Sequence, residues 1–341
     1  MTLTRELLRH LPKAELHVHL DGCLRPETMI ELAREQRVSL PAETPAELRE
    51  AMLVKNATSL EDYLERYAVT LAVMQTPAAL ERIAYEFVMD AARENVRYVE
   101  VRYCPALHTP ALTLTQAVES PLRGLGRAEA ETGVRVGLII CALRTLSPLL
   151  SEDLARLAVE YRSAGVVGFD LAGAERGHPA RDHRLAFAYA LAHGLACTCH
   201  AGEANGADSI RQALHDCGAQ RIGHGTRLGQ DPPLEEYVLE HRIPLEMCLS
   251  SNLHTRAVPD VAAHPARRYF DRGCIVTLNT DSRLMDGTDL TQEYWLAHTR
   301  LGFDRPGIDR LILNAFESAF LPEPEKSRLI EEIRHELRTI E

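Results

Sequence analysis

Short apolar runs alternate along this chain with longer segments in which apolar residues recur every three to four positions. The short runs are rich in Val, Ile and Leu and predict strands, whereas segments such as PAALERIAYEFVMDAARE and SEDLARLAVEYRSA predict amphipathic helices. Strands that alternate with helices are typical of a parallel sheet built from βαβ units. We predict eight strands, at residues 14–20, 97–103, 136–143, 166–172, 196–201, 221–225, 244–250 and 274–281.

Eight strand-and-helix units favour an α/β fold of the TIM (β/α)8 barrel type, with a large doubly wound open sheet as the alternative. No linker, repeat or low-complexity tract divides the chain, so residues 1–341 are expected to form a single barrel domain. The interval from about 22 to 96 is too long for one crossover and contains helical patterns. Because it follows the first strand, we expect a helical insertion over the catalytic face, either as a lid or as a peripheral packing unit.

Composition restricts the class of partner. The chain is 45% hydrophobic and 26% charged, as in a globular protein with a large core. Its 38 Lys and Arg against 49 Asp and Glu give a net charge of -11, the wrong sign for nucleic acid or an anionic membrane. There is no signal peptide and no apolar run of about 18 residues, so a cytoplasmic location is expected. The eight cysteines form no CxxC pair and are interpreted as reduced, buried thiols.

Polar residues interrupt several predicted strands near their ends. His17 and His19, in LHVHLDG, are two positions apart and therefore project from the same face of the first strand. Alone, such a pair is compatible with a core position. His200, His224 and Asp281, however, lie at the ends of three other strands, where barrel active sites are built. Three neutral histidines and a carboxylate predict a catalytic zinc site, at which the pKa of bound water falls to about 7.

Two further residues are candidates for proton transfer. Glu203, in HAGE, comes three residues after His200 and could exchange a proton with a substrate, or it could simply favour the dipole of the next helix. His224 has a glycine on each side, which would let a ligand or water approach its ring. Its position leaves open whether it is a metal ligand or a base beside the metal.

The motifs PKAELHVHLDG, YVEVRYCP, FDLAGAE, HAGE, RIGHGTRL and LNTD resemble, in order, those of the adenosine deaminase family. The resemblance extends from about residue 12 to residue 290. It implies hydrolytic deamination of adenosine and deoxyadenosine to inosine and deoxyinosine, with release of ammonia. It also implies one zinc ion (Zn2+) per chain, bound by His17, His19, His200 and Asp281.

The resemblance further implies the roles of the remaining site residues. Glu203 would protonate N1 of the purine, His224 would position and deprotonate the attacking water, and Asp281 would be catalytic as well as a metal ligand.

Four residues are implied contacts of the purine nucleoside. The backbone N–H of Gly173 would donate to N3, Asp21 would contact the 5′-hydroxyl of the ribose, and His19 would lie beside the substrate. Many family members carry a second Asp that hydrogen-bonds N7, but this chain has Ser282 there. We expect its hydroxyl to make a weaker or water-bridged contact with N7.

Other functions fit the sequence less well. Barrel hydrolases with two metals use a modified lysine at a strand end, whereas Lys13, Lys55 and Lys326 lie elsewhere. Cytidine-type zinc deaminases use cysteine ligands, and no CxxC is present. A non-enzymatic binding protein on the same barrel would not need the six candidate site residues. Deamination of another adenine-bearing nucleoside, such as aminofutalosine, is the main alternative, and the sequence does not indicate the oligomeric state.

Overall fold

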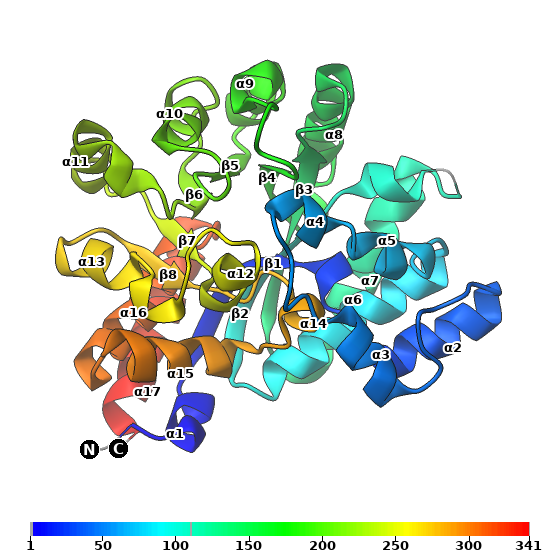
Figure 1. Cartoon of the computed structure of the whole chain (residues 1–341), viewed down its shortest axis with the longest axis horizontal. Coiled ribbons are helices and arrows are strands. Elements are labelled where there is room, and N and C mark those ends of the chain that lie inside the picture. Colours follow the sequence, from blue (N-terminus) through cyan, green and yellow to red (C-terminus); the bar gives the residue numbers. More distant parts are fainter. Residues whose placement is uncertain (1–2, 110, 341) are drawn as a thin grey trace.

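Eight parallel strands form a nearly closed ring surrounded by helices (Figure 1). The computed structural model describes residues 3–109 and 111–340. Each strand pairs with the next along the chain, and a parallel bridge between Val18 and Asp281 joins the two ends of the ring. The predicted TIM barrel is therefore confirmed, and the alternative of an open sheet is wrong. The strands are β1 (Lys13–His19), β2 (Val96–Tyr103), β3 (Arg135–Leu143), β4 (Val166–Ala172), β5 (Ala196–Ala201), β6 (Arg221–His224), β7 (Leu245–Met247) and β8 (Val276–Leu278).

The last two strands are shorter than the sequence pattern predicts. Residues 249 and 250 begin a helix instead of extending β7. Beyond β8, the side-chain oxygen of Asn279 accepts the backbone N–H groups of Leu16 and His17, at 2.8 and 3.1 Å. A side chain thus replaces the regular backbone ladder, which ends the strand before Asp281.

Helices connect successive strands and cover the outside of the ring (Figure 1). Their ends carry ordinary capping signals: Thr113 forms a capping box with Gln116, and Gly133 follows the same helix with a φ of 75°. The helices are α1 (Arg5–His10), α2 (Pro26–Gln36), α3 (Pro45–Met52), α4 (Leu60–Leu64), α5 (Tyr67–Ala72), α6 (Pro77–Ala92), α7 (Leu114–Thr132), α8 (Pro148–Glu160), α9 (Arg184–Ala192), α10 (Ala207–His215), α11 (Pro232–Glu240), α12 (Leu249–His254), α13 (Ala266–Asp271), α14 (Arg283–Asp286), α15 (Leu290–Leu301), α16 (Arg305–Ser318) and α17 (Glu323–Thr339).

The segment between β1 and β2 contains five of these helices. The last of them, α6, packs against α7 in the outer layer of the barrel. Leu60 and Tyr63 of α4 and Tyr67 and Leu71 of α5 instead line a cavity, together with residues at the C-terminal ends of β1, β3, β4 and β5. Part of the predicted insertion therefore forms one wall of this cavity.

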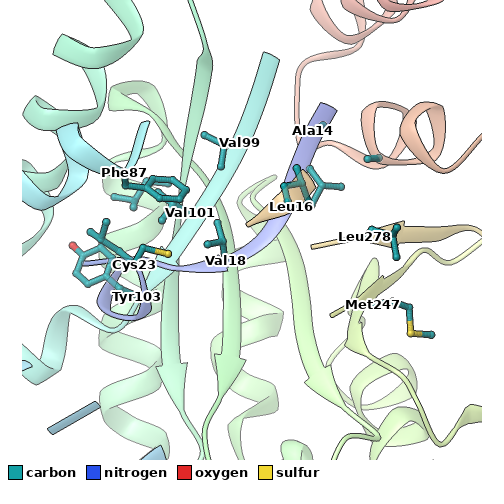
Figure 2. Close-up of a cluster of buried hydrophobic side chains, with 14 of the residues drawn as sticks. Ala14, Leu16, Val18, Cys23, Phe87, Val99, Val101, Tyr103, Met247 and Leu278 are labelled. Atoms are coloured by element: carbon teal, nitrogen blue, oxygen red, sulfur yellow. The ribbon is translucent and has the colours of Figure 1, made fainter. Parts of the chain in front are cut away.

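Apolar side chains fill the space around β1 and β2. Figure 2 shows Leu16 and Val18 of β1 in one buried cluster with Val99 and Val101 of β2 and Phe87 of α6. His17 and His19 alternate with the two β1 residues and point to the opposite side. All eight cysteines are free and buried, as predicted. Within the described residues, no helix combines the length and the apolar character needed to cross a bilayer.

Candidate metal and catalytic site

Three histidine rings and one carboxylate meet at the C-terminal end of the barrel. His17 and His19 come from β1, His200 from β5, and Asp281 follows β8 by three residues. One donor atom from each of the four lies within 4.8 Å of the others. The Nε2 atoms of His19 and His200 are 3.1 Å apart, and Oδ1 of Asp281 lies 3.4 Å from Nε2 of His19 and 3.5 Å from that of His17. The structure thus brings together the four predicted metal ligands.

Three of the donor separations fit ligands of a single zinc ion. Ligand atoms at about 2.0–2.1 Å from one zinc ion lie about 3 Å or slightly more from one another. The separations of 3.1, 3.4 and 3.5 Å agree with that spacing. Nε2 of His17 is also buried and has no hydrogen-bond partner among the described residues. Because a buried polar atom without a partner is costly, these residues fit a metal ion.

Carboxylates and a hydroxyl hold the ligands in orientation. Nδ1 of His17 lies 2.8 Å from Oε2 of Glu246, and Nδ1 of His200 lies 3.1 Å from Oδ2 of Asp170. The hydroxyl of Ser251 donates to Oδ2 of Asp281 at 2.6 Å. A carboxylate on the far nitrogen fixes the ring so that the other nitrogen faces the metal position.

Burial and charge keep three of the four ligands in the protonation states that bind metal. At the fourth, His200, burial lowers the pKa but the carboxylate of Asp170 outweighs it and raises the pKa above its usual value. Burial lowers the pKa of His17 to about 4, helped by the positive charge of Arg102, and burial also lowers the pKa of His19. Burial alone would raise the pKa of Asp281, but its close approach to His17 and the neighbouring histidine rings hold that pKa well below its usual range. These two imidazoles are therefore neutral near pH 7, while the carboxylate is ionised.

A buried carboxylate positions the loop that carries Glu203. The two oxygens of Glu175 accept backbone N–H groups from four consecutive residues after β5. The distances are 2.6 Å for Gly202, 3.1 Å for Glu203, 2.6 Å for Ala204 and 2.7 Å for Asn205. These bonds fix the backbone from which the Glu203 side chain projects, a contribution for which residue spacing gave no indication.

The Glu203 side chain is buried beside His224. Its Oε2 lies 3.5 Å from Nε2 of His224, and its Oε1 has no hydrogen-bond partner among the described residues. Burial raises the pKa of Glu203, although the neighbouring His224 opposes this shift. A carboxyl group in this state can hold a proton nearer neutral pH than an exposed glutamate can.

His224 occupies a position different in detail from the one its flanking glycines suggested. A Cβ at Gly223 would lie 2.9 Å from Cε1 of His17, so this glycine makes room for the His17 ring and not for an approach to His224. Nitrogen atoms of His17 and His224 also share a second group of possible ligands with Cys248 and Asp281. That group would need a cysteine whose pKa is raised well above its usual value by burial, so the cluster with His19 and His200 fits a metal better.

Hydrogen bonds fix which nitrogen of neutral His224 carries its proton. The backbone N–H of Ala266 donates to Nδ1 of His264, so the proton of neutral His264 is on Nε2 and points to Oδ1 of Asn252, 3.0 Å away. The amide nitrogen of Asn252 then donates to Nδ1 of His224, also over 3.0 Å. Nε2 of His224 therefore carries the proton and directs it toward Glu203.

The ligand cluster opens into a cavity of about 450 Å3, within the size range of small-molecule sites. Gly173 and Asp21, both predicted substrate contacts, line this cavity, and Oδ1 of Asp21 is buried without a partner among the described residues. Ser282 is fully buried and is not among the lining residues. No Lys or Arg occurs among the described residues of the lining, whereas five carboxylates do: Asp21, Glu61, Glu65, Glu203 and Asp281.

Comparison with known proteins identifies the family to which the chain belongs. Residues 12–336 match the sequence model of the family described as adenosine deaminase. The chain belongs to the adenosine deaminase family. It is 40% identical to the adenosine deaminase of Mycobacterium marinum, over 97% of this chain and 96% of that protein. It is 39% identical to a probable adenosine deaminase of Dictyostelium discoideum, where the match covers 95% of this chain but 42% of the relative.

A solved structure agrees with the sequence matches. The adenine deaminase of Arthrobacter aurescens superposes with a TM-score of 0.88 at 29% identity, covering 96% of this chain and all of that one. The resemblance to the adenosine deaminase family that the motifs indicated is therefore confirmed.

Beneath the ligands, this adenosine deaminase family member carries a buried network of charges that the site analysis of the sequence missed. Arg102 donates to Asp170 at 2.9 Å and to Glu246 at 3.0 Å, so one guanidinium joins the two carboxylates that orient His200 and His17. Arg221 in turn contacts Glu246 at 2.6 Å. The available signal was the presence of ionisable residues inside otherwise apolar strands, as in YVEVRY.

Two residues of the site adopt an uncommon backbone conformation. His224 has a φ of 64° and Asp281 a φ of 62°, both in the left-handed region that residues other than glycine rarely occupy. Such conformations persist where the surrounding structure determines them strongly, commonly at functional sites. In this family member, His224 is the last residue of β6 and Asp281 lies three residues beyond β8. At both positions the chain turns away from the barrel.

Proposed function

We propose that this chain catalyses the hydrolytic deamination of adenosine and deoxyadenosine to inosine and deoxyinosine, with release of ammonia. The observation that carries the proposal is the convergence of a metal-binding donor set and a buried, proton-holding Glu203 on one cavity. We propose one zinc ion per chain as cofactor. Its ligands would be His17, His19, His200 and Asp281.

A bound zinc ion would supply water with a pKa lowered to about 7, which makes a nucleophile available at neutral pH. The chain's own residues then direct the reaction. Asp281, as an ionised carboxylate beside the two imidazoles of β1, would also orient the attacking water as a hydrogen-bond acceptor.

Glu203 would deliver a proton to N1 of the purine as water adds at C6. The burial that raises its pKa favours the protonated acid, and its unpartnered Oε1 is available to the substrate. Protonation of N1 neutralises the charge that develops on the ring when C6 becomes tetrahedral.

His224 would position the attacking water. With its proton on Nε2, the neutral ring donates a hydrogen bond into the site. Removal of the water's proton by His224, the role implied by the family resemblance, would require the opposite tautomer. We therefore propose His224 primarily as a hydrogen-bond donor to the water. Glu203, ionised once it has protonated N1, would take up the proton released by the added water. It would then pass a proton to the departing amino group and recover one from the C6 hydroxyl, so that ammonia leaves and the C6 carbonyl forms.

The cavity favours a neutral nucleoside over a nucleotide. Its lining carries carboxylates and, among the described residues, no cation that could pair with a phosphate. Asp21 would accept a hydrogen bond from the 5′-hydroxyl, and the backbone N–H of Gly173 would donate to N3; His19 would lie against the base. Eight free, buried thiols suit a reducing compartment, so we also propose a cytoplasmic location.

The test is the loss of ultraviolet absorbance when the purified protein is given adenosine, deoxyadenosine, AMP, adenine or aminofutalosine. We expect the two unmodified nucleosides to react fastest. Glu203→Gln should retain metal and fold but reduce kcat at least about 100-fold, because the amide cannot donate an acidic proton. Turnover of aminofutalosine alone would replace the proposed substrate, and full activity of Glu203→Gln would remove the proposed acid.

A further inference from the structure

Ser282 lies behind the cavity wall. Its side chain is fully buried, and Gly22 packs so closely that a Cβ there would lie 2.7 Å from Oγ of Ser282. Among the described residues, the only side-chain hydrogen bond of Ser282 joins its hydroxyl to the phenolic oxygen of Tyr67. A small ligand in the cavity would therefore meet Tyr67 before it could meet Ser282.

Tyr67 forms the part of the wall in front of this serine. It lies on α5, is partly exposed and lines the cavity, with its ring centroid 6.3 Å from that of His19 and the two planes at 75°. Tyr63 lines the same cavity, but its hydroxyl donates to Oδ2 of Asp286 at 3.0 Å. The Tyr63 hydroxyl also lies near Ser282, but the hydroxyl that is hydrogen-bonded to Ser282 is that of Tyr67.

The two hydroxyl groups can satisfy one another and still leave a proton for a ligand. Each has one proton and can also accept a hydrogen bond. If Ser282 donates to the oxygen of Tyr67, the phenolic O–H is free to donate into the cavity. A ligand acceptor at that point allows two hydrogen bonds where the pair alone makes one, so it favours this arrangement of the two protons.

The proposed function specifies which acceptor faces this hydroxyl. It places C6 of the purine at the metal ligands and N1 toward Glu203, which follows β5. N7 then lies on the opposite side of C6 from N1. In the ring of strands, Ser282 follows β8 and His19 ends β1, so the pair of Tyr67 and Ser282 lies across the ligand cluster from the β5 loop.

We propose, resting on the proposed function, that Tyr67 is a specificity-determining residue that donates its phenolic proton to N7 of the base, and that Ser282 orients this hydroxyl. Ser282 is then a positioning residue. This assignment explains how a short, buried side chain contributes to purine recognition. The serine is too short to reach the base itself, but it orients Tyr67, a longer side chain from the insertion after β1, which contacts the base.

The experiment compares kcat/KM for adenosine and 7-deazaadenosine, which has carbon in place of N7. Wild type, Tyr67→Phe, Ser282→Ala and the double variant are measured, with Tyr85→Phe, which removes a tyrosine hydroxyl outside the cavity lining, as the control. We expect wild type to prefer adenosine by up to about tenfold, the effect of one neutral hydrogen bond. Tyr67→Phe should abolish that preference by slowing adenosine alone. Ser282→Ala should reduce it, the double variant should match Tyr67→Phe, and Tyr85→Phe should retain it.

Several outcomes would overturn the assignment. If Tyr67→Phe keeps the full preference while Ser282→Ala loses it, the serine itself reads N7. If wild type converts both substrates equally well, N7 is not recognised, although the proposed deaminase function stands. If wild type converts no 6-aminopurine nucleoside, the proposed function fails and this inference fails with it. Thermal unfolding of each variant separates a lost contact from a lost fold.

Discussion

The side-chain amide of Asn252 donates a hydrogen bond to Nδ1 of His224 over 3.0 Å, and this bond determines the tautomer of a residue at the centre of the site. Asn252 can present its nitrogen to His224 because its oxygen is held by His264. The proton of neutral His224 is therefore on Nε2, facing Glu203.

We predict that Asn252→Asp reverses this tautomer. A carboxylate can only accept a hydrogen bond, so Nδ1 of His224 would have to carry the proton, and Nε2 would lose it. The 15N chemical shifts of the His224 ring, assigned by comparison with His224→Gln, report which nitrogen is protonated. We expect the two shifts to exchange and kcat to fall at least about tenfold with the metal retained. A protonated Nδ1 in wild type would contradict the hydrogen-bond chain.

The hydrogen bonds from the loop at residues 202–205 to the Glu175 carboxylate lead to a second prediction. Glu175→Gln replaces one acceptor oxygen by a donor that faces backbone N–H groups of the loop at residues 202–205. We expect the free energy of unfolding to fall by about 2–4 kcal/mol, because buried donors lose their partner. kcat should fall as well, since Glu203 is no longer held. Glu160→Gln, an exposed substitution on α8, is the control for urea unfolding. If Glu175→Gln and Glu160→Gln changed the unfolding free energy and kcat equally, Glu175 would not be a positioning residue for the loop.

Metal removal tests the ligand set directly. Chelation should abolish activity, and one equivalent of zinc per chain should restore it. His19→Ala removes one of the four converging donors and should weaken zinc binding, measured by competition with a chromogenic chelator. His224→Ala should retain most of the zinc. A second bound equivalent, or loss of zinc from His224→Ala, would require a different ligand assignment.

The acidic cavity predicts discrimination against phosphate. We expect kcat/KM for AMP to be at least about 100-fold below that for adenosine, because Glu61 and Glu65 on the lining would repel the phosphate and no Lys or Arg among the described lining residues could pair with it. The difference should narrow as ionic strength rises. Glu65→Lys, which reverses a charge on the lining, should increase the AMP-to-adenosine ratio, whereas Glu50→Lys, outside this lining, should leave it unchanged. An unchanged ratio in Glu65→Lys would show that charge does not select the substrate.

A buried carboxyl group outside the catalytic machinery gives a pH-dependent prediction. Burial raises the pKa of Glu293 to about 7, and its partners are the hydroxyls of Ser250 and Thr288 and the Ser250 amide. The folded protein then binds a proton more tightly than the unfolded chain. This contribution to stability is complete below the unfolded pKa of about 4.3 and is lost as pH rises through about 7.

Glu293→Gln has a neutral side chain at every pH. Compared with the variant, wild type should therefore lose about 2–3 kcal/mol of unfolding free energy between pH 5 and pH 8. Urea unfolding at both pH values measures this difference. A difference that is constant with pH would show that Glu293 titrates normally.

The sequence by itself determined the order of elements and the residues that could carry chemistry. The period of apolar residues predicts strands and helices because each element buries one face, and two histidines two residues apart must share one face of a strand. That local rule fixed β1 and its two imidazoles. It placed the strand ends less well at β7, where a helix begins at Leu249, and at β8, where the Asn279 side chain replaces backbone pairing.

Only the tertiary structure decided which of these groups meet. His17 and Glu246 are separated by more than two hundred residues, yet closure of the ring brings them within 2.8 Å. The same closure makes Gly223 a space for the His17 ring and places Ser282 behind Tyr67. Periodicity specifies the face on which a side chain lies but not its neighbour from a distant strand, because that neighbour depends on strand register, helix placement and the packing of the whole barrel.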